Sequence, residues 1–513
     1  GGIEKHAICE RSLQNARVAR NERFTKRRRT GERRDTPTPG TIKNLVVLVE
    51  FSDLFGKKSR QEFEELFNKS GYNLDGAVGS VKDYYKETSY NQLNLESTVT
   101  EWVRLNNNFK YYGENDFFGN DKRPREMVEQ ALQKLEDSGF DFAPFDTNGD
   151  GWIDCITIIH AGHGEEYGNN NPDFIWSHKW QLATVKTYDG VKIQEYHTEP
   201  ELRGAETGTG ITRIGVICHE TGHFLGLPDL YDTDYSSEGI GKWGVMAAGS
   251  WGFGAGDGRR PTHFCAWSKV QLGWVTPRQV ENDAAVSLKP VKSDKEIVEI
   301  KHGKFPVGQY LLIENKQKIG FDADIPKAGL CIWRIDDNQA GNDNDKEWKG
   351  PGNDVTKHYL VALIQQDGYF HLEKENNQGD AGDVFSTGTL PKDTSGNVNS
   401  GYYPDSGTNV GNSEIEVTNI SASGSDMAFK VKGQVTVGIS DASLVEGNSG
   451  TTEMRFPVTL SYTTEEDVRV DYYTQNNSAV AGQDYEAVAG TLTIPPGNNG
   501  GEIVVNIFGD LVC

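Results

Sequence analysis

The chain has 513 residues, 36% of them hydrophobic, and a formal net charge of −23 at pH 7. This length exceeds what a single hydrophobic core organises, so we expect several folded domains. The acidic balance excludes nucleic-acid binding as the main function, because phosphate contacts need clustered Lys and Arg. No apolar run approaches the roughly 20 residues of a membrane-spanning helix, so we expect no membrane span. Six cysteines are too few for a disulfide scaffold, and pairing stays open among Cys155, Cys218, Cys265 and Cys331.

Residues 1–40 form a basic arm that differs from the rest of the chain. Residues 1–34 contain 11 Lys and Arg against 4 Asp and Glu, with basic runs at 26–29 and 33–34. Exposed dibasic runs are readily cut by proteases, so the arm is interpreted as a propeptide remnant whose removal activates the protein, or as an arm without a role. Cys9 suggests a further hypothesis, a thiolate that caps a metal in a latent form.

The next elements predict a helix packed on a sheet. A β-branched apolar run at 44–51 is typical of a buried strand, and helical spacing over 124–135 predicts a helix. A second strand is expected over 153–160.

The loop before that second strand has the pattern of a calcium-binding loop. Side-chain oxygens at loop positions 1, 3, 5 and 9 and a glycine at position 6 fit the pattern, namely Asp146, Asn148, Asp150, Asp154 and Gly151. Thr157 stands at position 12, where the pattern has a bidentate Glu, so a calcium ion needs a ligand from elsewhere. The alternative is an Asx-rich turn satisfied by its own backbone.

The stretch His-Glu-Thr-Gly-His, residues 219–223, is the most informative motif of the chain. On a helix, His219 and His223 project from the same face, where two imidazoles can bind one metal ion. Glu220 lies beside that metal and can accept the proton of an attacking water. The motif therefore predicts a zinc site that hydrolyses amides with Glu220 as the general base.

The residues after this motif indicate a third ligand. Gly226 can adopt the positive φ that ends a helix, and Pro228 prevents the helix from resuming. After this turn Asp229 can supply an oxygen, which gives a His-His-Asp set with an open position for water. A downstream carboxylate or a water is the alternative third ligand. The competing interpretation of the whole stretch is an amphipathic helix followed by a Gly-rich loop.

Six further segments carry a family resemblance, at residues 46–53, 79–85, 146–154, 160–162, 175–180 and 267–274. With the zinc motif they resemble the catalytic domain of immune inhibitor A-type metallopeptidases, which are secreted zinc proteases. The resemblance implies a metzincin-like α+β domain, protein or peptide substrates, a Zn²⁺ cofactor and an extracellular location. Residues 243–251 resemble a methionine turn, which in the metzincin clan places a methionine, here Met246, beneath the metal.

Past Trp274, short alternating segments separated by turn residues predict a β-sandwich. In the family this region typically reads Ile-Trp-His. Arg334 replaces that histidine here, which puts any role of the histidine in doubt. The acidic loops 336–337 and 380–383 are interpreted as solvated loops rather than as calcium sites.

The last 80 residues or so change character again. Segments at 445–450, 470–472, 481–485 and 490–494 resemble a Calx-beta module, a small antiparallel sandwich that binds calcium through acidic loops at one end. By position the matching carboxylates are Glu446, Asp484 and Asp510. The module appears truncated at Cys513, and its family suggests contact with a cell surface or matrix.

The predicted architecture is an α+β metzincin-like catalytic domain followed by all-β sandwich domains. Its expected units are an arm at 1–40, a zinc metallopeptidase domain at 41–282, a β-rich accessory domain at 283–432 and a Calx-beta-like module at 433–513. The predicted function is that of a secreted zinc-dependent endopeptidase, with Ca²⁺ as a second cofactor. The alternative is a catalytically silent, calcium-dependent adhesion or binding protein that retains the peptidase fold.

Overall fold

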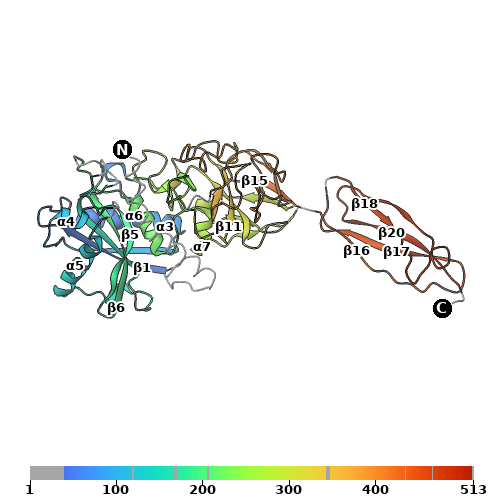
Figure 1. Cartoon of the computed structure of the whole chain (residues 1–513), viewed down its shortest axis with the longest axis horizontal. Helices are drawn as coiled ribbons and strands as arrows, with labels where there is room; N and C mark the ends of the chain where they lie inside the picture. The colour runs from blue at the N-terminus through green and yellow to red at the C-terminus, as the bar shows by residue number, and fades with distance from the viewer. Residues whose placement is uncertain are drawn as a thin grey trace.

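A computed structural model of the chain describes residues 40–510 except 118–120, 166–170, 205–206, 283, 343–346, 434 and 465. The basic arm and Cys9 therefore lie outside the described residues. Figure 1 shows a mixed helical and β-sheet part, a β-rich part beside it, and a separate elongated β unit at the C-terminal end. None of the helices in the described part of the chain is long and apolar enough to span a membrane.

A six-stranded sheet forms the centre of the N-terminal part. Its strand order is β2-β1-β4-β6-β5, with β3 paired to β1, and only β5 at the edge runs antiparallel to its neighbour. The strands are β1 Gly40–Glu50, β2 Leu93–Val99, β3 Val103–Arg104, β4 Cys155–His163, β5 His178–Tyr188 and β6 Val191–Leu202. The central strand β4 is buried along its whole length, as expected for a sheet covered on both faces. The predicted strands at 44–51 and 153–160 are confirmed, with shifted ends, as β1 and β4.

Helices pack around this sheet. Their bounds are α2 Arg60–Asn68, α3 Val81–Thr88, α4 Phe109–Gly113, α5 Pro124–Asp137, α6 Ile214–Phe224 and α7 Ala266–Gln271. The helix predicted at 124–135 is confirmed as α5, which has a proline in its first turn where no amide donor is needed. Helix α3 begins at a capping box between Ser80 and Asp83. Its buried Tyr85 hydroxyl donates to the carbonyl of Cys218 at 2.6 Å, which holds α3 against α6.

The β-rich part consists of two sheets packed on one apolar layer. The five-stranded sheet has the order β12-β11-β10-β9-β7, and the four-stranded sheet has the order β13-β14-β15-β8. The strands are β7 Arg278–Gln279, β8 Ala284–Leu288, β9 Ile297–Ile300, β10 Gln309–Lys316, β11 Gly329–Asp336, β12 Val361–Leu363, β13 Gly388–Leu390, β14 Glu416–Ile420 and β15 Met427–Lys432. A short helix, α8 Val291–Asp294, precedes β9. Side chains from both sheets, such as Ile332 and Phe429, share the buried layer.

Side chains on the outer face of the five-stranded sheet belong to the hydrophobic core of the N-terminal part. Buried residues of β10 and β11, among them Leu312 and Trp333, belong to the same apolar cluster as Trp267 of α7. A buried ion pair lies at this junction, with Lys316 Nζ 2.8 Å from Asp322 Oδ2. Asp322 Oδ1 also accepts from the backbone amide of His263 at 3.1 Å. The N-terminal part and the β-rich part therefore share an extensive buried interface.

The C-terminal unit is small and has a core of its own. It contains a three-stranded and a two-stranded antiparallel sheet. The strands are β16 Val437–Ile439, β17 Thr451–Leu460, β18 Val468–Tyr473, β19 Ala489–Ile494 and β20 Gly500–Phe508. The four cysteines in the described part of the chain all lie outside this unit, and all four are buried.

Candidate metal centre

Helix α6 carries the two histidines of the zinc motif. Its residues from Ile217 to Phe224 are all buried, so His219 and His223 are held inside the protein rather than on a solvated face. The helix ends where expected, because Gly226 has φ +94°, a conformation that glycine adopts without strain. The chain then reverses and brings Asp229 back to the two histidines.

Three side-chain atoms form a small triangle at this turn. His219 Nε2 lies 3.2 Å from His223 Nε2, and each of these nitrogens lies 3.1 Å from Asp229 Oδ1. Around a tetrahedral zinc with ligands at roughly 2.1 Å, ligand atoms are about 3.4 Å apart, so the triangle needs only a small expansion to hold the ion. All three residues are buried, and together they are one of the two groups in the described part of the chain that could hold a metal.

The other ring nitrogen of each histidine is anchored to the backbone. His219 Nδ1 lies 2.8 Å from the carbonyl of Val245, and His223 Nδ1 lies 2.8 Å from the carbonyl of Leu227. A carbonyl can only accept, so both Nδ1 atoms carry the proton and both Nε2 atoms direct a lone pair at the triangle. The donor set therefore fits a zinc ion in identity, tautomer and burial.

Glu220 lies beside the triangle without being part of it. Its Oε2 is 4.0 Å from His223 Nε2, and its side chain is 11% exposed, more than that of His223 or Asp229. Burial lowers the pKa of His219, but the hydrogen bond to Asp229 and the charge of Glu220 outweigh it and raise the pKa overall. The site thus has a negative potential that favours a cation.

The segment that follows helix α6 packs against this helix. Met246 is buried, and a Cβ on Gly222 would lie only 2.5 Å from its sulfur. Glycine between the two histidines therefore leaves room for the methionine. The carbonyl of Met246 accepts from the amide of Leu230 at 2.8 Å, next to Asp229 in the chain. The methionine of residues 243–251 thus packs against the metal helix.

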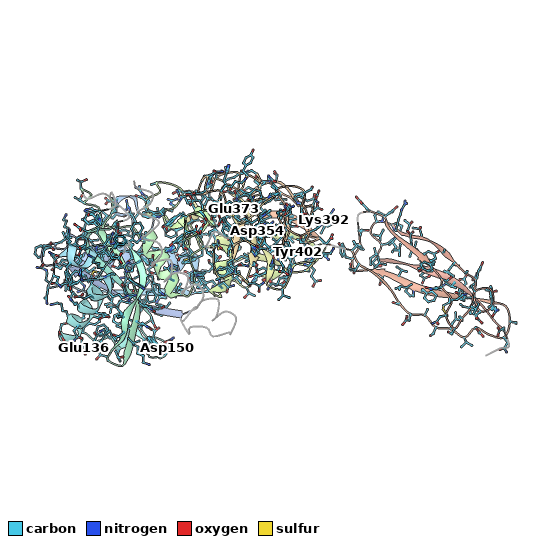
Figure 2. All side chains as sticks on the ribbon, viewed as in Figure 1. Glu136, Asp150, Asp354, Glu373, Lys392 and Tyr402 are labelled. Carbon is cyan, nitrogen blue, oxygen red and sulfur yellow. The ribbon has the colours of Figure 1, made fainter. Side chains whose placement is uncertain are left out.

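The predicted calcium loop at 146–154 lies away from this centre, and Figure 2 shows Asp150 at the margin of the N-terminal part. Asp146 and Asn148 both accept from the amide of Asp150, at 3.1 Å each, so these three side chains fold over the same turn. Asp154 accepts from the amides of Lys43 and Thr147 at 3.1 Å each, so it joins the start of this loop to β1.

The three acidic residues of the C-terminal unit come from segments that meet at one end. The amide of Phe508, near Asp510, donates to the carbonyl of Asp484 at 2.9 Å. A Cβ on Gly509 would lie 3.0 Å from the carbonyl oxygen of Glu446. The three segments therefore lie together at one end of the unit.

One buried carboxylate near the metal centre does not belong to the zinc motif. Glu199 in β6 is buried, and its Oε1 lies 2.6 Å from His197 Nδ1. Burial raises the pKa of Glu199, and the charge of Glu220 raises it further. No local spacing relates Glu199 to the motif, since the sheet alone brings it there. Two other histidines, His160 and His178, each have Nδ1 close to a backbone carbonyl oxygen, at 3.2 Å and 2.6 Å respectively.

Comparisons with known proteins agree with this geometry. Residues 35–275 match the family model described as "Immune inhibitor A peptidase M6, catalytic domain". Residues 432–513 match the Calx-beta domain. Both resemblances are thereby confirmed.

Two curated relatives carry peptidase names or family names. The chain is 36% identical over 276 residues to "Immune inhibitor A" of Bacillus thuringiensis subsp. alesti, covering 44% of this chain and 39% of that protein. It is 32% identical over 275 residues to "Pre-pro-metalloprotease PrtV" of Vibrio cholerae serotype O1 (strain M66-2), covering 45% and 30%. The chain thus spans less than half the length of these relatives. Its N-terminal half is a mixed α/β domain similar to peptidase M6 catalytic domains, and β-sheet domains follow it.

Proposed function

We propose that this protein is a zinc-dependent endopeptidase with a metzincin-like catalytic domain. The observation that carries the proposal is the buried triangle of His219 Nε2, His223 Nε2 and Asp229 Oδ1, with separations of 3.1–3.2 Å and Glu220 beside it. The match to peptidase M6 catalytic domains and the metalloprotease name of a relative point the same way.

His219, His223 and Asp229 would hold the zinc ion, which would supply Lewis acidity for the hydrolysis of a substrate amide. Glu220 accepts the proton of the attacking water and returns it to the amine that leaves. The backbone carbonyls of Val245 and Leu227 keep both imidazoles in one orientation and tautomer throughout. Asp229 supplies a negative charge that offsets part of the charge of the cation.

We propose further that the division into units at 41–282, 283–432 and 433–513 reflects function. The first unit is catalytic, the second supports it through the shared core, and the third, matching Calx-beta, binds calcium through Glu446, Asp484 and Asp510. Calcium in the loop of Asp146 and Asp150 would stabilise the start of β4. Secretion and cell-surface contact belong to the same proposal, and the extracellular supply of calcium suits it.

The test is hydrolysis of an unfolded protein such as casein by the purified chain after removal of the basic arm. We expect cleavage that stops with phenanthroline and returns with added zinc. Glu220→Gln should lower the rate by about 10²–10⁴ because it removes the general base while leaving the three ligands in place. Glu136→Gln, on helix α5 and remote from α6 in sequence, is the matched control and should keep full activity.

The contrary outcomes separate the two candidate functions. Full activity in Glu220→Gln would show that another group accepts the proton. A folded, zinc-loaded protein that cleaves nothing would favour the silent binding protein over the enzyme.

A further inference from the structure

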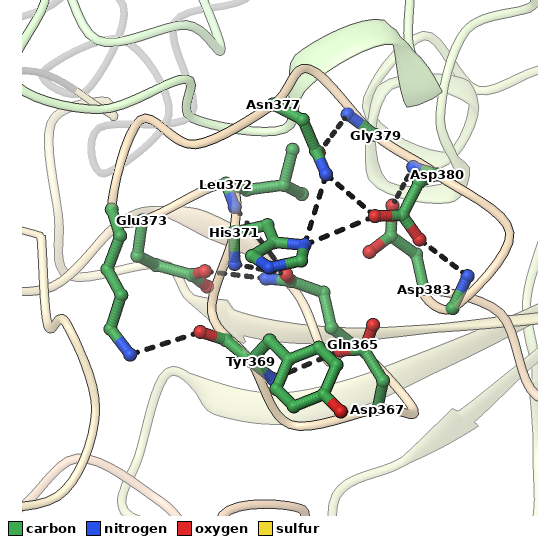
Figure 3. Close-up of polar contacts among 12 residues, drawn as sticks. Gln365, Asp367, Tyr369, His371, Leu372, Glu373, Asn377, Gly379, Asp380 and Asp383 are labelled. Carbon is green, nitrogen blue, oxygen red and sulfur yellow. Dashed lines mark hydrogen bonds and ion pairs between the residues drawn. The ribbon is translucent and has the colours of Figure 1, made fainter.

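A second group of metal-ligand side chains lies in the β-rich part, in the loop 365–383 between β12 and β13. One oxygen of Asp367, one ring nitrogen of His371 and one oxygen of Asp380 all lie within 4.8 Å of one another. The amide of Asp367 donates to the carbonyl of Gly382 at 3.1 Å and closes the loop. Figure 3 shows the side chains of His371 and Asp380 directed at each other.

His371 Nδ1 lies between a hydrogen-bond acceptor and a hydrogen-bond donor. This nitrogen lies 3.1 Å from Asp380 Oδ2, an acceptor, and 3.0 Å from Asn377 Nδ2, a donor. With a proton on Nδ1, both His371 and Asn377, whose Nδ2 lies 2.6 Å from Asp380 Oδ2, donate to this one carboxylate oxygen. The amide of Asn377 cannot be turned over, because its Oδ1 accepts from Gly379 N at 2.8 Å. A cation bound to both Nδ1 and Asp380 Oδ2 would take the place of the proton between them.

A buried carboxylate oxygen adds an independent observation. Asp383 is fully buried, and its Oδ2 accepts from the amide of Asp380 and from Trp243 Nε1, each at 2.7 Å. Its other oxygen, Oδ1, is buried and has no hydrogen-bond partner among the described residues. A buried acceptor without a partner is destabilising. Burial, followed by the charges of Asp380 and Asp367, raises the pKa of Asp383 to about 6.

The space around Asp367 is also shaped for a carboxylate. A Cβ on Gly382 would lie only 2.1 Å from Asp367 Oδ2, so glycine is required for this approach. The only ion pair that these three aspartates form with a described residue is that between Asp380 and His371. Three carboxylates thus converge in one loop without a lysine or arginine to balance them.

We propose that this loop binds a divalent transition metal of the zinc class, with His371 Nδ1, Asp367 and Asp380 as ligands and the buried Asp383 beside Asp380 in the same loop. The nitrogen ligand favours zinc over calcium or magnesium, which prefer oxygen ligands. The proposal does not depend on the proposed peptidase activity, because it concerns different residues of a different part of the chain.

The ion would fasten the loop to the segment that supports the first metal centre. The amide of Lys242 donates to the carbonyl of Gln378 at 2.8 Å, and Trp243 binds Asp383 as described above. Residues 242–243 lead directly into Val245, whose carbonyl anchors His219. The second ion therefore has a structural role, joining the β-rich part to the methionine turn.

The experiment is a zinc titration of the full chain by calorimetry, after chelation and in the presence of excess calcium to occupy oxygen-rich loops. We expect two tight zinc equivalents for the wild type and one each for His371→Gln, Asp380→Asn and His223→Gln. Asp405→Asn, an exposed aspartate of the same β-rich part, is the control and should retain two.

Each other outcome has a definite meaning. If His371→Gln and Asp380→Asn still bind as much zinc as the wild type, or if excess calcium displaces the zinc, the second site is refuted. If the proposed peptidase centre fails instead, the wild type binds one equivalent that survives His223→Gln and is lost in His371→Gln. Should the loop variants not fold, a zinc-edge anomalous map of the wild type decides, since a peak beside His371 Nδ1 supports the site and its absence overturns it.

Discussion

The buried ion pair of Lys316 and Asp322, in the β-rich part at its junction with the N-terminal part, gives the sharpest stability prediction. Lys316 Nζ and Asp322 Oδ2 are 2.8 Å apart, with side-chain exposures of 0% and 1%. Asp322→Asn keeps the volume and leaves an oxygen for the amide of His263, but it places an amide NH₂ or a neutral oxygen against the Lys316 ammonium. The perturbation therefore removes one charge of a desolvated pair with almost no other change.

The expected loss follows from two estimates. Burial raises the pKa of Asp322, but the positive charges of Lys316, His263 and Lys269 outweigh burial and lower the pKa from 3.8 to about 2. This shift corresponds to about 2 kcal/mol of stability at neutral pH. Breaking a buried pair typically costs about 3–5 kcal/mol, because the remaining charge is left without its partner. Glu314, which also lowers the energy of the Lys316 cation, partly compensates, so we expect about 3 kcal/mol.

The assay is urea unfolding followed by tryptophan fluorescence, since Trp333 Nε1 donates to Glu314 at 3.0 Å in the same buried cluster. Glu414→Gln, which breaks the exposed pair with Lys304, is the control and should change stability by less than about 1 kcal/mol. The double variant Lys316→Met/Asp322→Asn should recover most of the loss, because it removes the unpaired ammonium and keeps an oxygen for the amide of His263. A loss below about 1 kcal/mol in Asp322→Asn, or a double variant worse than the single one, would refute the reasoning.

Three further predictions concern acid, the helix turn and calcium. As pH falls from about 4 towards 2, the wild type should lose the part of its stability that the lowered pKa of Asp322 provides. The stability of Asp322→Asn should not show this loss. Equal acid sensitivity of the two proteins would contradict the assignment. Gly226→Ala should cost about 1–2 kcal/mol from strain alone, because φ is +94° and no atom lies within 4 Å of the added Cβ, and an unchanged melting curve would count against that backbone. Calcium should protect the start of β4 from proteolysis in the wild type but not in Asp146→Asn/Asp150→Asn, and equal protection in both would exclude this loop.

The residues that the sequence placed well are those linked by short spacing. Four residues separate His219 from His223, so helical geometry alone puts them on one face, and Gly226 determines where the helix ends. The position of Asp229 could be inferred for the same reason, since only a single turn separates it from the helix.

The features that the sequence did not reveal depend on contacts between distant segments. Glu199 reaches the metal centre because β6 crosses the sheet beside α6, which no local pattern records. The cluster at Asp367, His371 and Asp380 has irregular spacing in a long loop, and the acidic part of that loop was interpreted as solvated. The sequence near residue 282 does not indicate the buried interface between the N-terminal part and the β-rich part. Apolar residues of β10 are equally consistent with an internal layer of a sandwich.

The most direct test of the account is a zinc-edge anomalous difference map from crystals of the full chain. We predict a peak roughly 2.0–2.2 Å from His219 Nε2, His223 Nε2 and Asp229 Oδ1, with Glu220 beside the open position. Zinc that is absent from this triangle, or that takes its third protein ligand from a residue other than Asp229, would contradict the central claim.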